Sequence, residues 1–131
     1  RAQTPRDEMA WSDPTGNHLR LLTADTQAAA ITLINACREA GWPIYISSSR
    51  RTRDEQAKLV AAGLSANPRS KHLTGQAFDI DCLGLSRDDI PPYFWASVGP
   101  YAESIGLRWG GRWKSPYDPG HFEITQPSSS I

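Results

Sequence analysis

Two short segments of the sequence carry side chains that could bind a metal ion or transfer a proton. In the first segment, His72 precedes Asp79 by seven positions. Residues 77–82 alternate in polarity, as they do in a β-strand with one buried face. This alternation puts Asp79 and Asp81 on the same face of the strand. An imidazole that the preceding loop delivers next to these acids indicates a metal site or a proton-transfer site.

The second segment lies near the C-terminus, where residues 121–125 have the pattern of another strand. His121 and Glu123 share one face of this strand, and the alternate positions are apolar. Asp118 stands three positions before His121, in a Pro-Gly turn. Two strands that each bury one face and present histidine or carboxylate groups on the other could meet around one ion.

The ligands that these segments offer are of the kind that a catalytic zinc ion uses. Such a site has three protein ligands and leaves the fourth position for water. His72, Asp79 and His121 would supply two nitrogens and one carboxylate oxygen. Zinc lowers the pKa of its water to about 7, and an acid must then carry the proton to the leaving amine. We expect Asp118 to be this proton carrier.

Three further residues have supporting roles in this hypothesis. Arg51 stands where a short predicted strand meets a helix that starts with the capping box Thr52-x-x-Glu55. A strand end followed by a helix N-terminus is well suited to hold an oxyanion. We therefore expect Arg51 to polarise the scissile carbonyl or to hold a substrate carboxylate. Asp81 and Glu123 could orient the imidazoles of the ligands.

Short helices and strands are predicted to position these residues. Residues 1–22 are expected to form an irregular arm, residues 107–113 a Gly-Gly turn flanked by tryptophans, and residues 126–131 a frayed tail. The fold class is therefore α+β, with a small central antiparallel sheet flanked by helices in a single domain that spans 1–131. Helices are predicted over about 25–40, 52–63 and 92–105, and strands over 44–47, 77–82 and 121–125. Their buried faces are predicted to be Ala30, Leu33, Ile34 and Cys37 in the first helix, Ala57, Val60, Ala61 and Leu64 in the second, and Phe94, Val98, Tyr101, Ala102 and Ile105 in the third.

The composition argues against several classes of protein. The 14 basic and 14 acidic residues give a net charge of zero without any basic run, so neither nucleic acid nor an anionic membrane has electrostatic support as a partner. No apolar stretch approaches the length of a membrane span, and residues 1–16 lack the apolar core of a signal peptide. Cys37 and Cys82 fall on apolar positions, which favours two buried free thiols over a disulfide. We expect a monomer.

Each of these features, taken alone, also has an ordinary structural explanation. His18 lies among polar residues and is explained best as a solvated or capping side chain. Arg51 could simply pair with the acids of the helix that follows it. Trp109 and Trp113 are of a type found more often in a core than on a substrate platform. The combination of the features is what favours a site.

In combination, the motifs resemble those of the zinc D-alanyl-D-alanine carboxypeptidases and L-alanyl-D-glutamate endopeptidases. The segment from Ser70 to Asp79 is similar to the family signature Ser-x-His-x-x-Gly-x-Ala-x-Asp, and the pair Asp118 and His121 matches its second motif. Residues 48–63 resemble the upstream Ser-Gly-Tyr-Arg-Ser segment and its helix, with Ser49-Arg50 in place of Gly-Tyr. The Trp-Gly-Gly-x-Trp segment is similar to the branch that contains phage endolysins. The resemblance covers about residues 41–125.

This resemblance implies a function as well as a fold. It implies a hydrolase that binds one zinc ion per chain and cuts the peptide stems of peptidoglycan. The preferred activity is that of an L-alanyl-D-glutamate endopeptidase, as in a bacteriolytic phage endolysin that degrades the cell wall. A D-Ala-D-Ala carboxypeptidase and a non-catalytic cell-wall-binding module are the alternatives. Such an enzyme would act in the periplasm or cell wall, and without a signal peptide it would be made in the host cytoplasm and released by a holin.

The resemblance also assigns roles to residues. Its zinc ligands are His72, Asp79 and His121, its general base is Asp118, and its transition-state arginine is Arg51. Residues expected to contact the substrate or to support the ligands are Ser70, Asp81, Glu123, Trp109 and Trp113.

Overall fold

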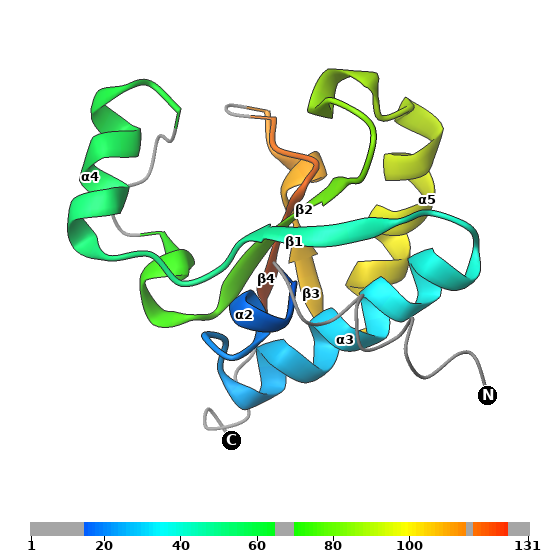
Figure 1. The fold of residues 1–131 in the computed structure, drawn as a ribbon, viewed down its shortest axis with the longest axis horizontal. Helices are drawn as coiled ribbons and strands as arrows, with labels where there is room; N and C mark the ends of the chain where they lie inside the picture. Colours follow the sequence, from blue (N-terminus) through cyan, green and yellow to red (C-terminus); the bar gives the residue numbers. More distant parts are fainter. Residues whose placement is uncertain (1–14, 65–69, 115–116, 126–131) are drawn as a thin grey trace.

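The computed structural model describes residues 15–64, 70–114 and 117–125, which form helices around a four-stranded sheet (Figure 1). The predicted class, an α+β fold with a small central antiparallel sheet flanked by helices, is confirmed. The described helices are α2 (Thr15–Leu19), α3 (Ala24–Glu39), α4 (Arg53–Ala61) and α5 (Pro92–Ser104). The strands are β1 (Ile44–Ser48), β2 (Ala77–Cys82), β3 (Leu107–Trp109) and β4 (His121–Ile124), and the short 3-10 helices are η1 (Lys71–Thr74), η2 (Arg87–Asp89) and η3 (Gly110–Arg112).

The sheet has the strand order β1-β2-β4-β3, and all neighbouring strands are antiparallel. The two strands that carry the predicted metal ligands are therefore adjacent, with Asp79 directly opposite His121. Strand β3 lies within the segment that was predicted to be only a turn. Its three residues are too few for a pattern of alternation, and it is defined by its pairing with β4, in which Arg108 lies opposite Glu123.

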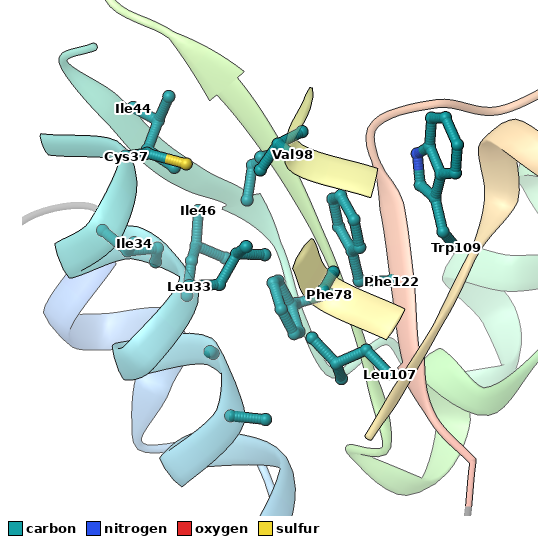
Figure 2. Close-up of a cluster of buried hydrophobic side chains, with 14 of the residues drawn as sticks. Leu33, Ile34, Cys37, Ile44, Ile46, Phe78, Val98, Leu107, Trp109 and Phe122 are labelled. Atoms are coloured by element: carbon teal, nitrogen blue, oxygen red, sulfur yellow. The ribbon is translucent and has the colours of Figure 1, made fainter. Parts of the chain in front are cut away.

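The apolar core lies between the sheet and the helices α3 and α5 (Figure 2). The predicted stripe of α3 is buried, as expected from the i, i+3, i+4, i+7 spacing. Phe78 of β2 and Phe122 of β4 stack with their ring centroids 5.7 Å apart, and neither ring is exposed. Complete burial of such a side chain stabilises the fold by roughly 1.5–3 kcal/mol. This core supports the β2–β4 pair from the side opposite to the predicted ligands.

The predicted apolar stripe of the second helix is wrong. Ala57, Ala61 and Leu64 are exposed, and α4 stands apart from α3 and α5 (Figure 1). The buried residue of α4 is Gln56. The capping box predicted to begin this helix is present in full, because Thr52 Oγ1 accepts from the Glu55 amide and the Glu55 carboxylate accepts from the Thr52 amide. Local capping, rather than core packing, therefore fixes where α4 begins.

Part of the predicted irregular arm is also ordered. Helix α2 begins at Thr15, and the side chains of Leu19 and Leu22 belong to the core. The Thr15 hydroxyl is buried and accepts a hydrogen bond of 3.0 Å from the Ile46 amide, which ties α2 to β1. The predicted arm is therefore wrong for residues 15–22. Residues 1–14 and the predicted tail at 126–131 lie outside the described residues.

Two further predictions need correction. Tyr101 was placed on the buried face of α5 but is 39% exposed, and Trp95 is buried in its place. Strands β2 and β4 were predicted to bury one face only, but every residue of both strands is buried.

Cys37 and Cys82 are buried free thiols, as predicted. No helix in the described segments is long and apolar enough to cross a membrane.

Candidate active site

The structure brings His72, Asp79 and His121 together. One potential ligand atom from each lies within 4.8 Å of the other two, and all three residues are buried. Asp79 and His121 meet because β2 and β4 are paired in this register. His72 comes from η1, the short helix that leads into β2.

Local geometry explains the Ser-x-His-x-x-Gly spacing around His72. The Ser70 hydroxyl caps η1 by accepting a hydrogen bond of 3.1 Å from the His72 amide. Gly75 ends η1 with a φ of 74°, where glycine is favoured. A β-carbon at this position would also lie 2.6 Å from the carbonyl oxygen of Leu21. The serine and the glycine thus fix the two ends of the turn that presents the imidazole.

Hydrogen bonds orient both imidazoles. His72 Nδ1 donates to the carbonyl of Ser49, so its Nε2 is the nitrogen that faces Asp79 Oδ1, at 3.3 Å. His121 Nε2 donates to Glu123 Oε1 at 2.9 Å, and its Nδ1 lies 3.1 Å from the same Asp79 oxygen. Each ring therefore has an acceptor on its far side and directs one nitrogen toward Asp79. This is the arrangement in which imidazoles serve as metal ligands, and the residues fit a zinc ion.

The charges of these groups are strongly coupled. Burial disfavours the ionised form of Asp79, but hydrogen bonds from His121 and His72 outweigh it and hold the pKa of Asp79 well below its usual value. Burial likewise opposes protonation of His121, yet hydrogen bonds to Asp79 and Glu123 raise its pKa to about 9. The site therefore concentrates negative charge that a proton or a cation must balance.

Arg51 is held rigidly beside the three residues. Its Nη2 donates to Asp79 Oδ2 and its Nη1 to Gln56 Oε1, each at 3.0 Å, and its Nε donates to Ser48 Oγ at 3.1 Å. The buried amide of Gln56 is thus a support for the guanidinium. The side chain of the neighbouring Arg50 is exposed.

Asp118 lies partly buried next to the same site. Burial raises the pKa of Asp118, and the negative charge of Asp79 raises it further. Its backbone is fixed by Gly110, which accepts from the Asp118 amide at 3.1 Å. A β-carbon on Gly110 would lie 2.2 Å from the carbonyl oxygen of Asp118. The backbone around Asp118 can therefore pack this closely only because residue 110 is a glycine. An acid with a raised pKa at this point is suited to proton transfer.

The remaining predicted residues have defined places. Trp109 is buried and donates to the Pro119 carbonyl at 2.8 Å, which makes it a support of the Asp118 turn. The ring of Trp113 lies 4.9 Å from that of His121. Of the two acids predicted to orient imidazoles, Glu123 does so.

Two sequence predictions near the site differ from the structure. Asp81 does not orient an imidazole, because both of its oxygens accept from Arg87, at 3.0 and 2.8 Å. His18 is not simply a solvated or capping residue, because its Nδ1 lies 2.8 Å from Ser49 Oγ. It thereby helps to hold the residue whose carbonyl orients His72. The contact between His18 and Ser49 joins segments 31 positions apart, and no local pattern in the sequence could have predicted it.

His72, Asp79, His121, Arg51 and Asp118 line one cleft of about 910 Å³. Strands β2 and β4 and helix η1 contribute the candidate ligands, α4 contributes Leu59, and Leu64 follows α4 in the chain. Charged residues of both signs are distributed along the cleft. They are Arg51, Lys71, Asp79, Arg87, Asp88, Arg108, Asp118 and Glu123.

Comparison with known proteins agrees with this geometry. Residues 64–124 match the model of a family described as D-alanyl-D-alanine carboxypeptidase. It is similar to the L-alanyl-D-glutamate peptidase of Listeria phage A118, with 34% identity over 110 residues. That alignment covers 79% of the chain but only 38% of the phage protein.

Solved structures share the fold. The L-Ala D-Glu endopeptidase ChiX of Serratia marcescens matches with a TM-score of 0.70 and 26% identity over 91% of this chain and 92% of that one. The vancomycin-resistance D,D-pentapeptidase VanY, solved in complex with Zn(II), matches with a TM-score of 0.59 and 17% identity over 80% of this chain and 73% of that one.

Proposed function

We propose that the chain is a zinc-dependent peptidase that cleaves the stem peptide of peptidoglycan, with the L-alanyl-D-glutamate bond as its preferred target. The observation that carries the proposal is the convergence of His72, Asp79 and His121 with Asp118 in one cleft. The preference for this bond is supported by the phage relative and by ChiX, which are named for it. Since the chain spans 38% of the length of the phage relative, the activity of the whole protein is part of the proposal.

His72, Asp79 and His121 would hold one zinc ion, through His72 Nε2, an Asp79 oxygen and His121 Nδ1. The ion would supply Lewis acidity and lower the pKa of a water molecule to about 7. Asp118 would accept the proton of the attacking water and deliver it to the leaving amine, for which its raised pKa is suitable.

Arg51 would stabilise the negative charge that develops on the scissile carbonyl oxygen. Its bonds to Ser48, Gln56 and Asp79 use three of the five N–H groups of a guanidinium, and the others remain for substrate. Because these bonds also fix the plane of the guanidinium, little reorganisation is needed as the charge develops.

The alternative functions make different products. A D-Ala-D-Ala carboxypeptidase is supported by the description of the matched family. A wall-binding module has no need for Asp118 next to an open metal position. We propose further that the protein is a monomer that acts on the cell wall after release by a holin.

Mass spectrometry of digested peptidoglycan tests the proposal. The zinc-loaded protein should produce new N-terminal D-glutamate and L-alanine with a free carboxyl end, and a chelator should abolish both products. Released D-alanine would identify a carboxypeptidase instead. If no new ends appear although zinc is bound, the binding module would be the better explanation.

A further inference from the structure

One end of the cleft carries more positive charge than the protein itself neutralises. Glu123, Lys71 and Arg108 lie together there. Glu123 Oε1 accepts from His121, and its Oε2 lies 3.6 Å from Lys71 Nζ and 3.7 Å from Arg108 Nη1. One carboxylate therefore faces two cations, and one positive charge remains in surplus at the cleft wall.

Arg108 has most of the unused hydrogen-bonding capacity in this group. Its distance to Glu123 is longer than a hydrogen bond, and its side chain is 58% exposed. Within the segments that the structure describes, Glu123 is its one ion-pair partner. Lys71 is less available, because it also donates to the Ile124 carbonyl at 3.1 Å. The donor fork of Arg108 is thus free to bind a ligand in the cleft.

The two other arginines that line the cleft are each hydrogen-bonded to an aspartate. Arg51 is bonded to Ser48, Gln56 and Asp79, as described above. Arg87 gives a bidentate hydrogen bond to Asp81, which neutralises it. Of the described arginines that line the cleft, Arg108 is therefore the one whose guanidinium is not hydrogen-bonded to an acid and can bind an entering carboxylate.

We propose that Arg108, assisted by Lys71, binds a free carboxylate of the substrate and so makes the enzyme selective for acidic stem peptides. The inference rests on the proposed peptidase function and names the feature of the substrate that is recognised. A guanidinium can bind a carboxylate through two parallel N–H···O bonds, and an ammonium adds a point charge. Where D-glutamate continues the peptide through its γ-carboxyl group, its α-carboxylate is free and adjacent to the bond with L-alanine.

The position of Arg108 suits a group close to the reacting bond. Arg108 of β3 lies opposite Glu123 of β4, and Glu123 is two residues from His121 on the same face of that strand. Directly opposed residues of antiparallel strands have their Cβ atoms about 5 Å apart. The long side chain of Arg108 therefore begins one strand away from the predicted metal ligands and extends along the cleft.

Steady-state kinetics of the zinc-loaded protein on three peptides test the inference. The first peptide is L-Ala-γ-D-Glu-L-Lys with both carboxylates free. The second has the α-carboxylate of D-glutamate converted to an amide, and the third has the carboxylate of lysine converted to an amide. On peptides that retain the recognised carboxylate, Arg108→Gln should raise KM by roughly 10–100-fold, the usual effect of losing a charged hydrogen bond. It should leave kcat within about twofold, since the loss is one of substrate binding.

The selectivity of the effect separates binding from a structural role. One of the two amidated peptides lacks the carboxylate that Arg108 binds, and on that peptide Arg108→Gln should leave KM nearly unchanged. The peptide that gives this result identifies which carboxylate is bound. Arg108→Lys should recover part of the loss, and Lys71→Met should raise KM less than Arg108→Gln does. A variant that merely disturbed Glu123 and His121 would affect all three peptides and the zinc content alike.

Arg112→Gln is the matched control. Arg112 is 59% exposed and pairs with Glu103 at 2.8 Å, and it is not among the described residues that line the cleft. It should leave KM unchanged on every peptide. If Arg108→Gln raises KM equally on all three peptides, or on none, the inference is overturned while the proposed function stands. If the wild-type protein cleaves none of them, the proposed function is overturned together with the inference.

Discussion

Strands β2 and β4 of the central sheet are buried on both faces, but the two faces are stabilised by different means. On one face, the side chains of β2 and β4 are apolar and pack against α3 and α5, as Phe78 and Phe122 do. On the other face, the same two strands bury four ionisable side chains, none of which is more than 8% exposed. These are Asp79, Asp81, His121 and Glu123.

The difference shows what the second face requires. Apolar side chains need only to be packed, whereas a buried charge is costly unless it is paired and hydrogen-bonded. Each of the four has a partner: Asp81 has Arg87, Asp79 has Arg51 and the imidazoles, and Glu123 has His121. A replacement by apolar residues of similar size would often be as stable. The buried charges on this face are therefore better explained by the proposed chemistry than by stability.

The largest effect is expected on the rate of hydrolysis, when a residue of the charged site that transfers a proton but does not bind the metal is changed. Asp118→Asn preserves the shape of the side chain but removes its basicity. We expect hydrolysis to fall by roughly 10²–10⁴-fold, the contribution typical of general acid–base catalysis, while zinc remains bound. Zinc content and the rate of wall digestion should be measured on the same preparation. Loss of zinc together with activity would make Asp118 a ligand or a structural support.

On the apolar face, Phe122→Ala should act on stability. The residue is completely buried, so its truncation should lower the free energy of unfolding by about 3–5 kcal/mol. The folded fraction should still bind zinc, because none of the proposed ligands is changed. Denaturant titration with and without zinc measures both properties. If Phe122→Ala unfolds at the same denaturant concentration as the wild-type protein, this face contributes less to stability than its burial indicates.

The next effect concerns the transition state. Arg51→Ala should reduce turnover by about 10²–10³-fold, the loss seen when one oxyanion donor is removed. Arg50→Ala is the matched control, because Arg50 is adjacent and exposed. It should retain nearly full turnover. If Arg50→Ala is the impaired variant, the assignment of the transition-state arginine is off by one position.

The smallest effect is a dependence of zinc affinity on pH. Since hydrogen bonds to Asp79 and Glu123 raise the pKa of His121 to about 9, a metal must displace a proton at neutral pH. Affinity should therefore rise about tenfold per pH unit toward pH 9 and then level off. Cys37, whose pKa burial raises to about 12, stays protonated over this range. Competition with a chromophoric chelator measures the slope, and a flat profile would refute the proton displacement.

Much of this site could be predicted from the sequence because its determinants are local. Strand alternation placed Asp79, His121 and Glu123, and the Ser70 cap with Gly75 explains how the turn presents His72. The capping box could also be predicted from the sequence, because its two hydrogen bonds join residues three positions apart.

Most of the parts that were missed depend on contacts between distant segments. The bond between His18 and Ser49 and the position of Arg108 opposite Glu123 are fixed by tertiary structure. The pairing of Asp81 with Arg87 joins residues only six positions apart, but it depends on how the turn after β2 folds back on the strand. The face of α4 was wrong for a related reason. A helix that stands away from the core does not have to bury its apolar residues, and this cannot be seen in their spacing.

Metal analysis of the two histidine variants tests the central claim most directly. Wild-type protein should bind about one zinc ion, and His72→Ala and His121→Ala should each lose it, because each removes one of the three ligands of a catalytic zinc site. His18→Ala removes the remaining histidine of the chain, which contacts Ser49 but is not a proposed ligand, and should lose far less zinc than the two ligand variants. Full zinc occupancy in His72→Ala or His121→Ala would contradict the proposed ligand set and the mechanism that depends on it.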